Sequence, residues 1–216
     1  MTNNLAVVFR ELGRFEESLD HLNRSLTLIP PKHVVGRLMI TCSVGMIQHA
    51  QRKHEEAART LDEMLSGCTA IDYQPGIALA QMVLCNIHRA LGNLTTSVEH
   101  GRAALTLARQ LKLHRVECEV LNSLAEAALA ANDVDHAEMV YAQAKEHSAH
   151  HSFARFEARA LEGLAHTARA RGDIAEAERH WRKAIDRYPI GMYDSTHAQQ
   201  HLASLDDETT TCFRCE

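Results

Sequence analysis

The sequence contains one pattern five times over, and this repetition constrains the fold more than any other feature. Each copy consists of an apolar stretch, a short break and a second apolar stretch. The breaks are spaced by 39, 40, 40 and 40 residues and fall at Gly13, Arg52, Gly92, Asn132 and Gly172. A fixed period of about 20–50 residues indicates stacked repeats, each of which buries its apolar face only against its neighbours.

When the copies are aligned on the breaks, three columns contain small residues with one exception. The column seven residues before the break holds Ala6, Gly45, Cys85, Ala125 and Ala165. The column five residues after it holds Ser18, Ala57, Ser97, Ala137 and Ala177. The column twelve residues after it holds Ser25, Met64, Ala104, Ala144 and Ala184. Apolar residues recur at three and four residues, the helical period, so each copy predicts two antiparallel helices that approach closely.

The period also predicts the boundaries of the repeats. Five helix pairs are expected within residues 1–192, at about 1–34, 38–71, 78–111, 118–151 and 158–190. Residues 193–216 are expected to form a capping helix, from about Ser195 to Leu205, and a flexible tail. Asp173 precedes Glu176 by three residues, the spacing of a capping box, and Asp133 and Asn93 occupy the matching N-cap positions.

Composition agrees with an all-α protein and excludes several functions. Gly (10) and Pro (4) are sparse, and a net charge of −5 offers no basic field for nucleic acid or anionic membranes. The N-terminus lacks the pattern of a signal peptide, and the most apolar run, residues 77–87, is too short to cross a bilayer. Six scattered cysteines suit a reducing cytosol. We therefore expect a cytoplasmic protein.

The repeats resemble the tetratricopeptide repeat. The first unit matches that family's positions with Leu5, Ala6, Phe9, Gly13, Ser18 and Pro30, and the last with Leu164, Ala165, Gly172, Ala177, Trp181, Ala184 and Pro189. The family's usual period is about 34 residues, so a period of 40 implies longer helices or longer loops. The resemblance implies a right-handed α-solenoid of five helix pairs with a C-terminal capping helix. It also implies a scaffold that binds a protein or peptide, without enzymatic activity.

A finer resemblance concerns the phrases NNLAVVFRELGRFEESLDHL and ARALEGLAHTARARGDIAEAERHWRKAI. They are similar to the C-terminal repeat regions of actinobacterial transcription regulators of the antibiotic-regulatory-protein class. In those proteins the repeats sense a ligand or partner, and a separate domain binds DNA. The abrupt start of the first unit leads us to expect a fragment of a longer protein rather than a naturally short, uncapped chain. The alternative function is a free-standing adaptor that bridges two partners.

In this architecture the first helix of every pair lines a concave surface. The predicted peptide-binding residues on that surface are Arg10, His49, Asn86, Arg89, Asn122, Glu126, His166 and Arg169. Three residues before the break the column reads Arg10, His49, Arg89, Leu129 and Arg169. This column predicts a track for an acidic peptide, with Asn86 and Asn122 bonding its backbone. The alternative is that these residues only suit the C-terminal end of a helix.

Two groups of histidines have spacings that a metal site would require. His147, His150 and His151 share one helix face, and His197, His201, Cys212 and Cys215 could close a zinc site. The first group has no carboxylate or thiol nearby to complete it, and the DDETTT segment inside the second is typical of a flexible tail. No motif of nucleophilic catalysis is present. We therefore predict no metal site, no cofactor and no catalytic residue.

Overall fold

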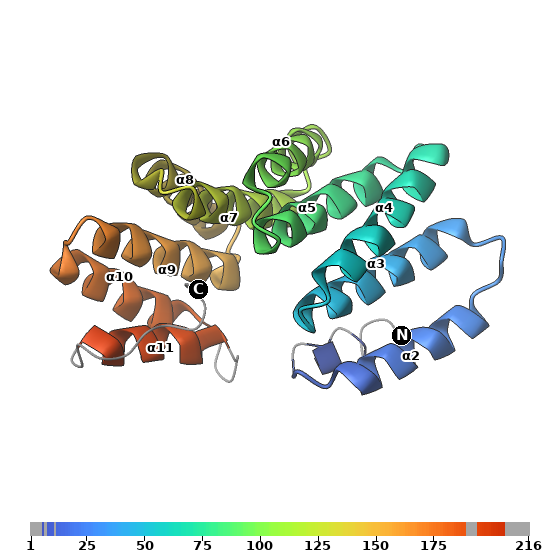
Figure 1. The fold of residues 1–216 in the computed structure, drawn as a ribbon, viewed down its shortest axis with the longest axis horizontal. Helices are drawn as coiled ribbons and strands as arrows, with labels where there is room; N and C mark the ends of the chain where they lie inside the picture. Colours follow the sequence, from blue (N-terminus) through green and yellow to red (C-terminus); the bar gives the residue numbers. More distant parts are fainter. Residues whose placement is uncertain (1–5, 7, 11, 189–193, 206–216) are drawn as a thin grey trace. The chain divides into compact units, whose positions relative to one another are not determined.

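The computed structural model describes residues 6, 8–10, 12–188 and 194–205, and all regular secondary structure in this part of the chain is helical (Figure 1). The chain divides into two compact units, residues 1–117 and 118–216, and the boundary lies within helix α7 (His114–Ala130). Each unit is described by itself. None of the described helices is long and apolar enough to cross a membrane.

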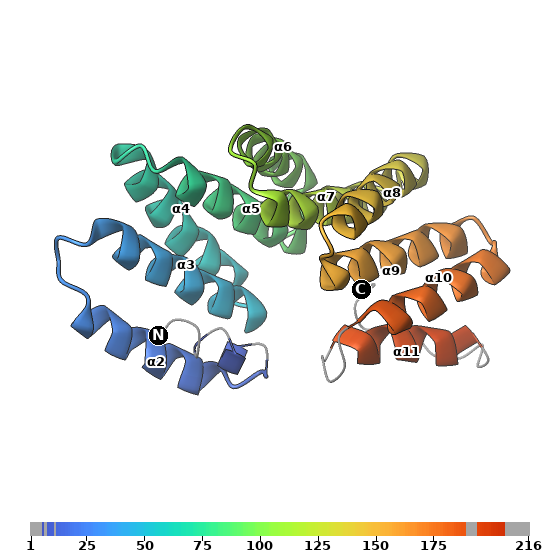
Figure 2. The same ribbon diagram turned by 180° about the vertical axis from the view of Figure 1, so that it is seen from behind.

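The helices follow the expected pairs, but from the second pair onward the first helix of each pair begins four residues earlier than the boundary expected from the sequence. After a helical stretch at residues 6 and 8–10, the first unit contains α2 (Phe15–Leu28), α3 (Val34–Ala50), α4 (His54–Ala70), α5 (Gln74–Ala90) and α6 (Leu94–Gln110). The second unit contains most of α7, followed by α8 (Val134–His150), α9 (Ala154–Ala170), α10 (Ile174–Arg187) and α11 (Asp194–Leu205). Figure 2 shows the same elements from behind.

The period of 40 residues arises from long helices rather than from long loops. Each helix from α3 to α9 contains 17 residues. Only three residues separate each of these helices from the next. One repeat is therefore two 17-residue helices and two three-residue turns. Of the two explanations that the sequence allowed, longer helices or longer loops, the first is correct.

The predicted breaks are turns in which the backbone adopts a left-handed conformation. All five residues have positive φ angles: Gly13 (72°), Arg52 (62°), Gly92 (78°), Asn132 (60°) and Gly172 (81°). At the last turn the Gly172 N–H donates to Arg169 O at 2.9 Å, and the Asp173 N–H donates to Ala168 O at 3.0 Å. These two bonds form a Schellman motif, which satisfies the carbonyls at the end of a helix.

The N-cap predictions are confirmed at two of three turns. Asp173 Oδ1 accepts a hydrogen bond from Glu176 N at 2.9 Å, and Asp133 Oδ1 accepts one from His136 N at 3.2 Å. Asn93 occupies the predicted N-cap position of α6, but its side chain makes no capping bond. The Glu176 carboxylate contacts Arg179 (2.6 Å) and His180 (3.2 Å) one turn further along its own helix, and Arg179 supplies the positive charge because burial lowers the pKa of His180.

The small columns lie where two helices of a pair cross. Every member of the three columns is buried. Ser18 Oγ donates to Ala6 O at 2.6 Å, and Ser97 Oγ donates to Cys85 O at 2.7 Å, so two repeats share the same contact. A Cβ atom on Gly45 would lie 1.9 Å from Leu61 Cδ2. The close approach predicted from the sequence is therefore confirmed.

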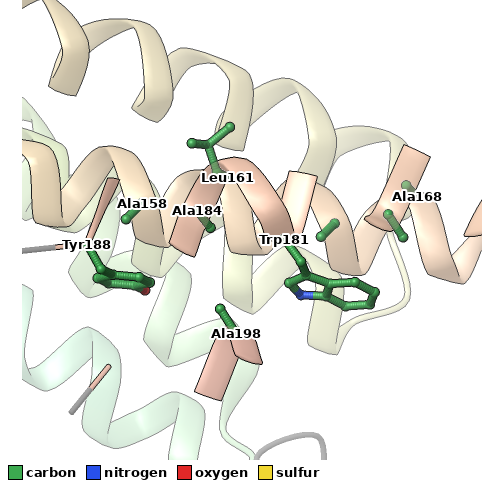
Figure 3. Packing of buried hydrophobic residues seen from close by; sticks show 9 residues of the cluster. Ala158, Leu161, Ala168, Trp181, Ala184, Tyr188 and Ala198 are labelled. Atoms are coloured by element: carbon green, nitrogen blue, oxygen red, sulfur yellow. The ribbon is translucent and has the colours of Figure 1, made fainter. Parts of the chain in front are cut away.

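The apolar core of each unit is continuous from one helix pair to the next. In the first unit Leu22, Ile40 and Ile47 join α2 to α3. In the second, one cluster joins α7, α8 and α9 through Ala125, Ala128, Ala137, Tyr141 and Leu164. The next cluster joins α9, α10 and α11 through Ala158, Leu161, Ala165, Ala168, Ala177, Trp181, Ala184, Tyr188 and Ala198 (Figure 3). The described cysteines Cys42, Cys68, Cys85 and Cys118 are buried, and none of them forms a disulfide with another.

Helix α11 occupies the position of the first helix of a further repeat. It begins forty residues after α9, and Ala198 lies forty residues after Ala158, with both side chains fully buried. Figure 3 shows Trp181 and Tyr188 on either side of Ala198. The expected capping helix is therefore present. The tail from residue 206 onward lies outside the described residues.

Replacing Ala125 by Leu tests the crossing of the helices. Ala125 is fully buried, so the larger side chain should overpack the contact and lower the free energy of unfolding by about 1–3 kcal/mol. Ala130→Leu is the matched control on the same helix, and because Ala130 is exposed it should cost at most about 0.5 kcal/mol. Urea unfolding of the second unit, followed by Trp181 fluorescence, measures both. Equal costs would contradict this packing.

Candidate functional site: the first-helix face

Half-buried polar side chains lie on neighbouring first helices of the first unit. Helices α3 and α5 are in direct contact, and each presents side chains three and six residues before its break. We call this surface the first-helix face of the first unit. Its members, all half-buried, are Arg10, Met46, His49, Asn86 and Arg89.

His49 is the most perturbed titratable group on this face. Its Nδ1 lies 3.0 Å from Nδ1 of His54, the first residue of the next helix. Burial lowers the pKa of His49 to about 4, and the nearby charges of His54 and Arg89 contribute to the shift. His49 is therefore neutral at pH 7. In the predicted cationic column the arginines therefore carry the positive charge at pH 7, and His49 becomes charged only in strongly acidic solution.

Arg10 and Arg89 supply that charge in the first unit. Arg10 Nη1 lies 3.1 Å from Met46 Sδ, which holds the guanidinium against α3. Arg89 lies close enough to His49 to affect its pKa. On α5, one turn before Arg89, the Oδ1 atom of Asn86 is buried and has no hydrogen-bond partner among the described residues. A buried amide oxygen without a donor is unfavourable, but this atom has no accessible surface, so another chain can reach it only after the half-buried side chain turns outward.

Asn122 has a structural role in the second unit. Its side chain is fully buried, and Nδ2 donates to Cys118 O at 3.0 Å and to Phe156 O at 3.3 Å. The second bond joins α7 to α9. Because the amide has no exposed surface, it cannot bond the backbone of a bound peptide, and we omit it from the proposed contacts.

The other three predicted residues of the second unit have different environments. Glu126 forms an ion pair with Arg159, with 2.7 Å between Oε1 and Nη2. His166 is half-buried, with its ring edge-on to Trp181 at a centroid distance of 5.6 Å. Arg169 is exposed near the end of α9. The structure thus gathers the predicted residues of the first unit on one face, whereas those of the second unit are dispersed.

The structure describes only some of the residues that were considered for metal binding. The rings of His147 and His151 lie 4.7 Å apart between centroids, and those of His150 and His151 lie 4.8 Å apart. His201 is buried on α11. The side chain of His197, and Cys212 and Cys215, lie outside the described residues.

The structure brings together one group that the sequence reasoning missed. Glu162 and His166 on α9 meet His201 on α11, and the hydroxyl of Tyr188 donates to Glu162 Oε2 at 2.9 Å. The spacing of four between Glu162 and His166 was a local signal for a shared helix face. The contribution of His201 depends on how α11 packs, which no local pattern reveals.

Comparisons with known proteins agree with this architecture. Residues 158–188 match the family model of the tetratricopeptide repeat. No curated protein matches the chain. Among solved structures, the chain is similar to Bacillus thuringiensis PlcR in complex with the peptide PapR7 and DNA. The TM-score is 0.75 at 14% identity, covering 95% of this chain and 73% of that one.

The chain is also similar in fold to two further solved structures. One contains the TPR-like repeats of a kinesin light chain from Podosopora anserina, with a TM-score of 0.61 at 17% identity, covering 86% of this chain and 92% of that one. The other is the apo form of RapI, with a TM-score of 0.65 at 12% identity, covering 86% and 81%. The chain therefore has the fold of TPR-like helical repeat proteins.

The lowered pKa of His49 predicts a pH dependence of stability. Between about pH 6.5 and pH 4 the unfolded chain binds a proton at this residue that the folded chain does not, so stability falls as pH falls through this window. The full effect is about 3 kcal/mol. His49→Gln should remove that part of the pH dependence, whereas His136→Gln, on an exposed position, should not. Chemical unfolding at several pH values, followed by circular dichroism, measures the difference.

Proposed function

We propose that this chain is a peptide-binding scaffold whose first-helix face in the first unit holds an acidic segment of a partner protein. The observation that carries the proposal is the placement of Arg10 against α3, through Met46, and of Asn86 and Arg89 on α5, which contacts α3. In this proposal the protein acts by binding alone, in the cytoplasm, without a catalytic residue and without contacting nucleic acid or membrane itself.

The two arginines supply the attraction. Both are half-buried in a chain whose net charge is −5, so they form a local cationic site in an acidic protein. Exposed ion pairs contribute little, but a partly desolvated guanidinium that forms a forked pair with a carboxylate can dominate an interface. Neutral His49 beside Arg89 adds a hydrogen-bonding group without charge at pH 7.

The geometry suits an extended chain better than a small metabolite. Packed helices lie about 8–10 Å apart, so three successive first helices span roughly 20 Å. At about 3.3 Å per residue this length holds on the order of six extended residues. Once its half-buried side chain turns outward, Asn86 provides an amide oxygen that can accept from one backbone N–H of such a segment.

We further propose that the chain is the partner-sensing module of a bacterial transcription regulator. The likeness to PlcR, a protein crystallised with a peptide and with DNA, supports a role in which repeats of this fold read a peptide. The resemblance to the repeat regions of actinobacterial regulators supports the same role. The second candidate is a free-standing adaptor. A DNA-binding or nucleotide-switch domain encoded in frame beside these repeats would favour the first, and a separate reading frame the second.

Arg89→Ala should weaken peptide binding roughly tenfold, about 1.4 kcal/mol, because it removes one of the two guanidinium groups of the face. Selection from a library of random peptides of about 6–12 residues should enrich Asp and Glu, and the affinity of the selected peptides should fall as salt increases. Calorimetry with one selected peptide compares the variants.

Arg102→Ala is the matched control, because Arg102 is exposed on α6, the second helix of the same pair. Arg109 on that helix is a poorer control, since it pairs with Glu117 at 2.9 Å. Equal losses from Arg89→Ala and Arg102→Ala, or a library selection without acidic enrichment, would refute binding at the first-helix face.

A further inference from the structure

Three side chains with metal-ligating atoms meet in the second unit. Glu162 and His166 project from α9 and His201 projects from α11, and one ligand atom from each lies within 4.8 Å of both others. Glu162 is 5% exposed and His201 is 1% exposed, while His166 is half-buried. The half-buried ring leaves a path by which an ion can enter an otherwise enclosed group.

We propose that Glu162, His166 and His201 bind a divalent transition-metal ion, with Zn²⁺ as the best match, and that this ion fastens α11 to the last helix pair. Two imidazoles and one carboxylate form a ligand set that zinc accepts in tetrahedral coordination, with a fourth position for water. Zinc bonds of about 2.0–2.2 Å place such ligand atoms roughly 3.4 Å apart, so closure needs a shift of about an ångström. The inference does not depend on the proposed peptide binding.

The surroundings orient the ligands as the outer shell of a metal site does. The Tyr188 hydroxyl donates to Glu162 Oε2 at 2.9 Å, which fixes the carboxylate. The Trp181 ring stacks on His201 at 5.3 Å and 10°, and it meets His166 edge-on. Figure 3 shows Trp181 and Tyr188 in the same cluster beside α11. These large side chains hold the ligands in an apolar setting that strengthens their attraction to a cation.

The group is specific to the last interface of the described chain. One repeat earlier, the equivalents of Glu162, His166 and His201 are Asn122, Glu126 and Leu161, which do not form this ligand set. Helix α11 contains 12 residues, whereas α9 contains 17. A helix of this length is marginal without tertiary support. An ion bound by both α9 and α11 supplies that support at α11, the last described helix.

The experiment uses the full chain without a histidine tag, stripped with chelator and titrated with Co²⁺ or Zn²⁺. Trp181 is the single tryptophan of the chain, and it touches two of the three ligands. Co²⁺ should therefore quench most of its fluorescence with one-to-one stoichiometry and produce the visible absorption of four-coordinate cobalt. Zn²⁺ at about one hundred times its Kd should raise the melting temperature of the full chain by roughly 5–10 °C.

The variants separate metal binding from ordinary packing. Glu162→Gln keeps the size of the side chain and an acceptor for Tyr188, so the metal-free melting temperature should be nearly unchanged. It should nevertheless lose the cobalt absorption, the quenching and the zinc-induced shift. His166→Gln should lose the same signals. His180→Gln is the control, because His180 is also half-buried in the second unit but lies outside the ligand group.

Two outcomes would overturn the proposal. The first is a wild-type chain in which Co²⁺ leaves Trp181 fluorescence unchanged. The second is quenching that survives Glu162→Gln and His166→Gln, which would assign the binding to other histidines. If His166→Gln fails to fold by circular dichroism, Glu162→Gln alone decides, because its metal-free stability is measured in the same experiment.

Discussion

The contact on which the structure depends is the close approach of two helix backbones within each pair. At that crossing the side chains are small, with the exception of Met64, and serine hydroxyls bond directly to the facing carbonyl, as Ser18 does to Ala6 and Ser97 to Cys85. Larger residues such as Leu61, Tyr141 and Trp181 are buried beside them. Within each unit the repeats use the same positions, so each interface there is set by local contacts.

Because the small columns form the crossings, the remaining positions of the first helices can differ in sequence from one repeat to the next. In the first unit they carry arginine, asparagine and histidine in half-buried positions, where desolvation makes each polar group depend on its neighbours. His49 shows the cost, since burial keeps it neutral. In the second unit Glu126, at the position equivalent to Asn86, pairs with Arg159, and Asn122 one turn earlier bonds Phe156 O. The same register thus carries half-buried polar side chains in the first unit and an internal joint between helices in the second.

The fold could be predicted from the sequence because its determinants are local and periodic. Five residues with positive φ mark the turns, and the small columns mark the crossings. The side-chain environments could not be predicted equally well. Asn93 occupies an N-cap position without making the bond, and Asn122 is buried because the Phe156 carbonyl from the next repeat reaches it. Glu162 and His201 are 39 residues apart, so only the stacking of α11 shows that they meet.

The uniform turns have a consequence for how chains of this kind change length. Each three-residue connection ends one helix and starts the next, and the helices between them have equal length. Removing or duplicating forty residues would therefore keep the alternation of first and second helices. A change of twenty residues would instead place a second helix where a first helix belongs, and would turn the small columns away from each other. Variation in length by whole pairs is thus the change that this architecture tolerates.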